Sequence, residues 1–191
     1  MKTDKATVAV LMGSDSDWEV MAAATRRLEA FGIAYDVHVM SAHRTPARVA
    51  AYVAAAPARG VAVFIVGAGG AAHLAGVVAA HTTRPVLGVP LDATSMKGLD
   101  ALLATVQMPA GVPVATFAIG KAGAENAAIC AAQILALKDG ALATKLERFK
   151  EEMATKVEAR DRELRARVLP AGAEPPPAGG KLRRIKSVDK A

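Results

Sequence analysis

Short apolar runs rich in Val and Ile alternate along residues 1–140 with longer, Ala-rich segments whose apolar positions recur every three to four residues. Short apolar runs are typical of buried strands, and the longer period is typical of helices. Their alternation predicts repeated βα units around a parallel sheet with helices on both faces. The predicted strands cover residues 7–12, 34–40, 61–66, 86–89 and 114–119.

The helices between and after these strands are predicted at residues 17–31, 46–58, 74–81, 98–106 and 122–138. The second helix has a clear start signal, because Thr45 can cap free backbone N–H groups and Pro46 suits the first helical position. Five strands are enough for a doubly wound sheet, so we expect residues 1–140 to form a single α/β domain.

A different pattern follows Gly140, where charged residues alternate with sparse apolar ones. We expect residues 141–168 to form a long helix that packs on the body or on a neighbouring subunit. Its apolar stripe consists of Leu142, Leu146, Phe149, Met153 and Val157. Residues 169–191 are rich in Pro, Gly and basic side chains and are expected to form a flexible tail.

The formal net charge of +6 is concentrated in the last quarter of the chain. Residues 1–140 hold 11 Lys and Arg against 10 Asp and Glu, whereas residues 141–191 hold 13 against 8. A nearly neutral body with only 4% aromatic residues argues against a nucleic-acid groove, which needs basic and stacking side chains. Binding of RNA or acidic partners by the basic tail remains open as a separate role.

Cysteine usage and hydropathy indicate a cytoplasmic protein without membrane spans. Cys130 is the only cysteine, so no intramolecular disulfide can form. The N-terminal apolar stretch is short and runs into acidic residues, unlike a signal peptide. Two uncharged stretches, residues 60–83 and 101–120, are interrupted by Gly or Pro. No Cys pair or His cluster has the spacing of a metal site, so no metal is expected.

Ligands of open parallel sheets bind beyond the carboxyl ends of the strands, which makes the segments after each predicted strand informative. These segments read GSDSD, SAHRTP, GAGGAAH, PLDATS and GKAGAEN. In the second, a hydroxyl (Ser41), an imidazole (His43) and a guanidinium (Arg44) lie close together. Of the four histidines, His43 and His73 lie in small-residue loops at this edge, where an imidazole can transfer protons near neutral pH.

The GSDSD segment joins a buried strand to a helix, so Ser14, Ser16 and free backbone N–H groups would stabilise a phosphate there. Asp17 would suit the hydroxyls of a ribose. Plain helix capping by Ser16 or Asp17 explains the same residues without any ligand.

Residues 67–72, GAGGAA, formally match the dinucleotide fingerprint, and Asp92 follows near the end of the next strand. A dinucleotide-binding oxidoreductase is therefore an alternative. Against it, the fingerprint belongs in the first βα turn of its unit, and here it follows the third strand. Consecutive glycines also serve where a ligand or another chain approaches the backbone closely.

Five motifs, in order, resemble the class I PurE family, the N5-carboxyaminoimidazole ribonucleotide mutases of purine biosynthesis. They are MGSDSDW, SAHRTP, GAGGAAHLAG, PVLGVP and VQMPAGVPVATFAIGKAGAENAA, and the resemblance spans residues 6–138. It implies a flavodoxin-like three-layer αβα sandwich, assembled as an octamer with active sites between subunits. It also implies an isomerase that moves the carboxylate of its ribonucleotide substrate from N5 to carbon 4 without cofactor or metal. The related class II activity, direct carboxylation of aminoimidazole ribonucleotide with CO2, is the alternative.

The resemblance also implies roles for individual residues. His43 corresponds to the general acid/base of the family, Arg44 with two serines to the phosphate site, and Asp17 to the ribose site. Ala75 departs from the family pattern, which usually has Pro there. The implied substrate-binding residues are Ser14, Ser16, Asp17, Ser41, Ala42, Arg44, Gly69, Gly70, Ala71, His73 and Leu74.

Overall fold

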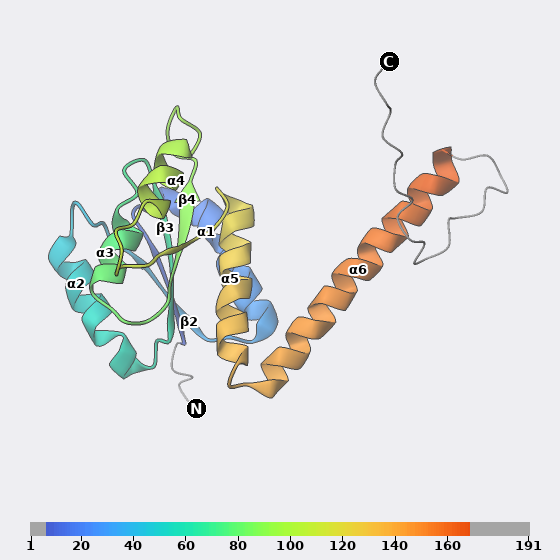
Figure 1. Cartoon of the computed structure of the whole chain (residues 1–191), viewed down its shortest axis with the longest axis horizontal. Helices are drawn as coiled ribbons and strands as arrows, with labels where there is room; N and C mark the ends of the chain where they lie inside the picture. Colours follow the sequence, from blue (N-terminus) through green and yellow to red (C-terminus); the bar gives the residue numbers. More distant parts are fainter. Residues whose placement is uncertain (1–6, 169–191) are drawn as a thin grey trace, which may run out of the picture. The chain divides into compact units, whose positions relative to one another are not determined.

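The computed structural model describes residues 7–168. Its sheet has the strand order β2-β1-β3-β4-β5, and all neighbouring strands are parallel. The strands are β1 (Val8–Met12), β2 (Tyr35–Val39), β3 (Val63–Gly69), β4 (Val86–Leu91) and β5 (Ala115–Thr116). This order is that of flavodoxin-like folds, so the predicted fold class is confirmed (Figure 1).

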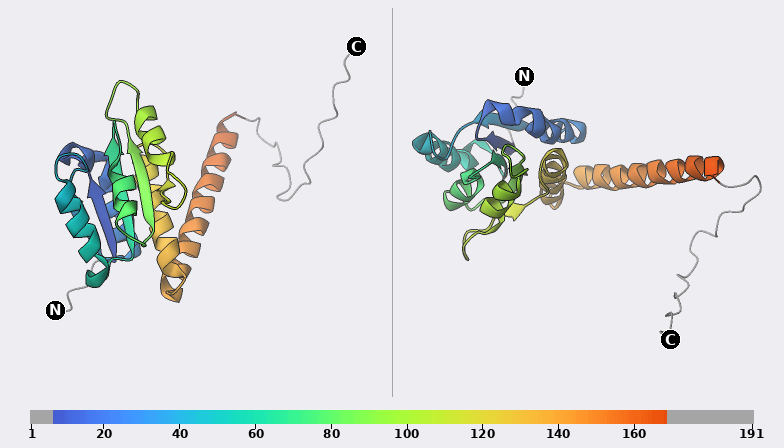
Figure 2. Two further views of the ribbon diagram at one scale, coloured as in Figure 1. Left: turned by 60° about the vertical axis from the view of Figure 1, so that its left-hand side comes forward. Right: turned by 90° about the horizontal axis from the view of Figure 1, so that it is seen from above.

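Helices cover both faces of the sheet, as the alternating pattern predicts. Seen from above in Figure 2, α1 and α5 lie on one side of the sheet, and α2 and α3 lie on the other. The helices are α1 (Trp18–Phe31), α2 (Pro46–Ala55), α3 (Leu74–Ala80), α4 (Leu99–Val106), α5 (Lys121–Ala136) and α6 (Gly140–Val168). Two short 3-10 helices, η1 (Asp15–Asp17) and η2 (Pro57–Arg59), precede α1 and follow α2.

Small aliphatic side chains build the core. All five residues of β1 are buried, and Phe64 is the largest fully buried side chain. Burying one such side chain stabilises the fold by roughly 1.5–3 kcal/mol. The face of α5 toward the sheet is made of alanines that are wholly inaccessible to solvent, which lets this helix approach closely. They are Ala124, Ala127, Ala128, Ala131 and Ala132.

One helix and one strand end earlier than the apolar pattern predicted, and a proline is involved in each case. The second helix was predicted to reach residue 58 but ends at Ala55, because Pro57 has no N–H to donate to the carbonyl of Val53; Ala56 keeps helical angles and the chain continues into η2. The last strand was predicted over residues 114–119 but has two residues. The N–H groups of Phe117 and Gly120 still donate to carbonyls of β4, at Gly88 and Pro90. Pro90 has no N–H that could donate to β5, so the hydrogen-bonded pairing of β4 with β5 ends there.

The chain divides into two compact units, residues 1–147 and 148–191. In the first, Leu142 at the start of α6 is buried and Lys145 Nζ donates to the carbonyl of Phe31 at 2.8 Å. In the second, Met153, Val157 and Leu164 are exposed along the helix. The proposed tail, residues 169–191, lies outside the described residues. Within residues 7–168, no helix combines the length and apolarity needed to cross a membrane.

Candidate functional site

A cavity of about 380 Å³ lies beyond the carboxyl ends of the central strands, the edge that the topology predicts for a ligand. All the predicted site residues line it except Gly70. Sequence reasoning missed three other lining residues, Gly13, Ala68 and Ala93, although each lies in or beside a segment already noted at the carboxyl edge. Side-chain chemistry gave no signal for them, because they contribute backbone and small apolar surface.

The loop after β1 is organised by its own hydrogen bonds. Ser14 is the N-cap of η1: its Oγ accepts the N–H of Ser16, and its own N–H donates to Asp17 Oδ2 at 3.0 Å. The Ser16 hydroxyl also donates to Ser14 Oγ at 2.9 Å. Capping therefore occurs here, with Ser14 as the cap where Ser16 or Asp17 had been considered. The same residues line the cavity, so the capped turn and a ligand site are compatible.

Among the influences on the pKa of the Asp17 carboxyl, burial is the largest. Desolvation raises the pKa of Asp17 above its ordinary value, and hydrogen bonds from the N–H groups of Ser14 and Gly13 offset only part of that rise. The guanidinium of Arg44 adds a smaller lowering influence. Asp17 is thus a partly buried carboxylate held by backbone donors at the cavity wall.

The loop after β2 is also held by side-chain hydrogen bonds. Ser41 Oγ accepts the N–H groups of His43 and Arg44 at 3.3 and 3.2 Å. Thr45 Oγ1 accepts the N–H of Ser41 at 2.9 Å and donates to the Ser41 carbonyl at 3.1 Å. Thr45 occupies the N-cap position of α2 but makes no side-chain cap bond, so the predicted capping by its hydroxyl was wrong; the hydroxyl closes the loop on itself. Pro46 does occupy the start of α2.

Arg44 joins the two polar loops. Its Nη2 donates to the carbonyl of Gly13 at 3.0 Å, across 31 positions of sequence. A guanidinium has five N–H donors, so one such bond fixes its position and leaves donors for an anion in the cavity. The serine hydroxyls and this cation form a polar end of the cavity that suits a phosphate.

The glycine-rich loop, residues 67–72, begins with the last three residues of β3 and takes its shape from missing side chains. A Cβ on Gly67 would lie 2.4 Å from the sulfur of Met21, so this glycine permits packing of α1 on the sheet. A Cβ on Gly69 would lie 2.5 Å from the Cβ of Ala93, which brings the segment after β4 against the cavity. Gly70 has a φ of 60° and turns the chain toward α3. Because Gly67 lies inside β3 and serves core packing, it does not form the tight turn that the first glycine of the dinucleotide fingerprint forms.

His43 and His73 meet at the cavity from these two loops. His43 Nε2 and His73 Nδ1 are 2.8 Å apart in a hydrogen bond, and the rings meet edge to face with centroids 5.0 Å apart. Both side chains are exposed in the single chain. Within residues 7–168, no group of three or more His, Cys, Asp or Glu side chains is arranged to hold a metal ion.

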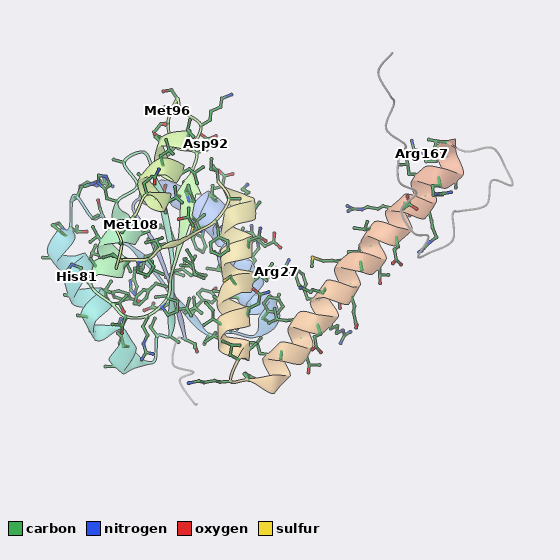
Figure 3. The ribbon with its side chains drawn as sticks, viewed as in Figure 1. Arg27, His81, Asp92, Met96, Met108 and Arg167 are labelled. Carbon is green, nitrogen blue, oxygen red and sulfur yellow. The ribbon has the colours of Figure 1, made fainter. Side chains whose placement is uncertain are left out.

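The remaining histidines lie away from this cavity. His38 Nε2 bonds to Asp36 Oδ2 at 2.8 Å, and the Tyr52 hydroxyl donates to the same oxygen at 3.0 Å, which ties β2 to α2. Burial and the Asp36 carboxylate raise the pKa of Tyr52 to about 12. His81 ends α3; Figure 3 shows it well below Asp92 and Met96, which lie in the segment after β4.

Comparison with known proteins identifies one family. Residues 7–156 match the AIR carboxylase family. An N5-carboxyaminoimidazole ribonucleotide mutase of Brucella melitensis is 53% identical over 153 residues, which cover 80% of this chain and 94% of that protein. A protein of the same name from Saccharolobus solfataricus is also 53% identical, over 78% of this chain and 94% of its own length.

Solved structures agree on the fold at lower sequence identity. A crystal structure of Treponema denticola PurE superposes with a TM-score of 0.75 and is 29% identical, covering 82% of this chain and 97% of that one. The relatives named as mutases are thus considerably more similar in sequence than this structural neighbour.

Proposed function

The chain belongs to the AIR carboxylase family, and on that premise we propose that it is the mutase that converts N5-carboxyaminoimidazole ribonucleotide to 4-carboxyaminoimidazole ribonucleotide in de novo purine biosynthesis. The observation that carries this proposal is the cavity itself. It combines a polar end suited to a phosphate with an imidazole suited to proton transfer, in a chain about half identical to proteins named as this mutase.

The phosphate and ribose of the substrate bind at the polar end. Ser41 Oγ already accepts two backbone N–H groups, so its own hydrogen is available to donate to a phosphate oxygen. Ser16 and Arg44 complete the phosphate site, and Ser14 supports the loop that carries Ser16. Asp17 accepts from the ribose hydroxyls, because an ionised carboxylate is an acceptor only.

The reacting ring and the migrating carboxylate lie beside the loop after β3. Gly69, Gly70 and Ala71 offer backbone with little side-chain bulk, so their N–H groups can approach a carboxylate closely. Leu74, His73 and Ala42 complete the walls of this part of the site. Leu74 is buried, which gives the site a dry side.

His43 carries the proton in both halves of the reaction. The C–N bond of the N-carboxylate breaks when the exocyclic nitrogen accepts a proton, which releases CO2 and the free amine. Carbon 4 of the electron-rich ring then attacks the retained CO2, and the proton on carbon 4 returns to the enzyme. One imidazole can perform both transfers, because it both donates and accepts a proton, a contribution typically worth about 10²–10⁴ in rate.

On this proposal the enzyme works in the cytoplasm as a homo-oligomer, an octamer. Leu99, Leu103 and Val106 repeat along one side of α4, and each is about half exposed. Exposed apolar surface of this kind is typical of protein contacts. His43 and His73 are exposed in the single chain, whereas chemistry that retains CO2 requires a closed site. Coverage by a second copy accounts for both features.

The decisive test measures conversion of N5-carboxyaminoimidazole ribonucleotide without added bicarbonate, for the wild type and His43→Asn in parallel. We expect an active wild type and a folded variant that is slower by about 10²–10⁴. An inactive wild type that instead carboxylates aminoimidazole ribonucleotide at high CO2 would identify the direct carboxylase. Equal rates for both proteins would remove His43 from the mechanism and leave the mutase activity standing.

A further inference from the structure

The partner of His43 is a second imidazole. His43 Nε2 is 2.8 Å from His73 Nδ1, and the ring planes meet at 79°. Within the described range 7–168, neither ring has another hydrogen-bond partner. One nitrogen of each ring, His43 Nδ1 and His73 Nε2, is therefore directed away from the shared bond and is available to a ligand.

A carboxylate in the position of His73 would constrain the His43 ring differently. Carboxylates only accept, whereas a neutral imidazole has one donor and one acceptor. Of the described residues that line the cavity, Asp17 is the only carboxylate, and its Oδ2 accepts the N–H of Ser14. The proton state of His43 is therefore coupled to a group that can itself hold a proton.

We infer that His43 and His73 act as one hydrogen-bonded pair in the proton transfers of the reaction. In this pair His73 is the positioning residue, because it fixes which nitrogen of His43 faces the substrate. This inference rests on the proposed mutase function. When His73 Nδ1 accepts from His43 Nε2–H, the neutral His43 ring has its lone pair at Nδ1. The atom that exchanges the proton is then His43 Nδ1.

The proton balance of the reaction fits this pair. In its loaded form the pair holds three protons: one on each outer nitrogen and one in the shared bond. His43 Nδ1–H gives its proton to the exocyclic nitrogen of the substrate as the C–N bond breaks and CO2 forms. After the bond from carbon 4 to CO2 has formed, the proton of carbon 4 returns to Nδ1. The pair ends as it began, and the shared proton stays between the rings.

The two loops that carry the rings make this contact reproducible. Ser41 Oγ holds the N–H of His43, and the N–H of His73 donates to the carbonyl of Ala71 at 2.7 Å. Both backbones are thus fixed close to the rings. Loss of the His73 ring leaves Nε2 of His43 without its partner and lets the His43 side chain turn away from the productive orientation.

The first test detects the bond directly and does not depend on activity. Protein labelled with ¹⁵N-histidine is studied at pH 8 by solid-state NMR for a ¹⁵N–¹⁵N coupling across the shared hydrogen bond. We expect a coupling between His43 Nε2 and His73 Nδ1 in the wild type and none in His73→Phe. A wild-type protein without this coupling overturns the pair, whatever the enzyme converts.

The second test separates the loss of the hydrogen bond to His43 from the loss of the volume of the His73 ring. His73→Phe keeps an aromatic ring without hydrogen bonding, and His73→Asn keeps an amide that can still accept from His43. We expect kcat to fall about a hundredfold in His73→Phe with KM changed less than about threefold, and His73→Asn to recover at least about tenfold of that loss. His81→Phe, at the far end of α3 and outside the cavity, is the matched control and keeps the wild-type kcat.

The outcomes distinguish this inference from the proposed function. An active wild type with an unchanged kcat in His73→Phe, or with His73→Asn no faster than His73→Phe, overturns the pair and leaves the mutase in place. If the wild type converts no substrate, the proposed function fails, and the NMR coupling alone decides whether the two rings share a proton. Measuring circular dichroism of each variant ensures that only folded proteins are compared.

Discussion

The polar loops after β1 and β2 and the glycine-rich loop that begins at the end of β3 line the same cavity but are fixed by opposite means. In the polar loops, Ser14, Ser41 and Thr45 bond to nearby backbone, so the loops are held by side chains that are present. In the glycine-rich loop, Gly67 and Gly69 permit contacts with Met21 and Ala93 that any side chain would block.

This difference indicates how each loop responds to mutation. A polar loop loses one hydrogen bond at a time, so its defects should be graded and local. The glycine-rich loop depends on close packing, so one added methyl group must move a neighbouring segment. Four substitutions test the contrast, in order of expected effect.

Arg44→Met should have the largest effect, because Arg44 joins the two polar loops and is proposed to bind the phosphate. We expect kcat/KM to fall about a hundredfold, which corresponds to about 2.7 kcal/mol. Most of the change should be in KM, since the phosphate does not react. Steady-state kinetics measures it, with the exposed Arg48→Met in α2 as control; equal losses in both variants would refute the specific role of Arg44.

Gly69→Ala should disturb the glycine-rich loop through the methyl of Ala93, only 2.5 Å from the new Cβ. We expect a destabilisation of about 1–3 kcal/mol in urea unfolding and a loss of about tenfold in kcat/KM. Adding Ala93→Gly should restore much of both, because it removes the clashing atom. Gly140→Ala, which meets nothing within 4 Å, is the control. A double variant no better than Gly69→Ala would show that the clash is not the cause.

Thr45→Val should loosen one polar loop without changing its bulk. It removes both hydrogen bonds between the Thr45 hydroxyl and the backbone of Ser41. We expect a loss of about 1 kcal/mol, seen as a fall in Tm of about 2–4 °C. Thr144→Val, which removes a hydroxyl bonded within exposed α6, should change Tm little. Similar falls in Tm in both variants would mean that the hydrogen bonds between Thr45 and Ser41 stabilise the protein no more than an exposed hydroxyl bond within a helix.

Asp17→Asn should have the smallest effect on stability, and its sign reverses the usual expectation. Burial raises the pKa of Asp17 above the unfolded value, so the folded state holds the proton more tightly and the ionised form costs stability at neutral pH. The amide should therefore stabilise the protein slightly at pH 7, while weakening substrate binding. Urea unfolding at pH 7 and pH 4 checks this: the gain should shrink as the pH falls through the folded pKa toward 3.8. A gain that grows toward pH 4 would contradict it.

The sequence predicted the general plan because strand and helix periods are local properties. The fold class followed from alternating apolar runs, and the site followed from the rule that parallel strands present their carboxyl ends together. Element ends were less well predicted. Pro57 and Pro90 ended a helix and a ladder through missing N–H groups whose consequence depends on what lies beside them.

By itself, the sequence determined the succession of strands and helices along the chain, the family, and which polar residues reach the edge of the sheet. Tertiary structure alone decided their partners: Thr45 with Ser41, Arg44 with Gly13, Gly69 with Ala93 and His43 with His73. The physical reason is range. Periodicity and motifs record each segment separately, whereas a hydrogen bond or a close contact between loops depends on the packing of the strands that carry them.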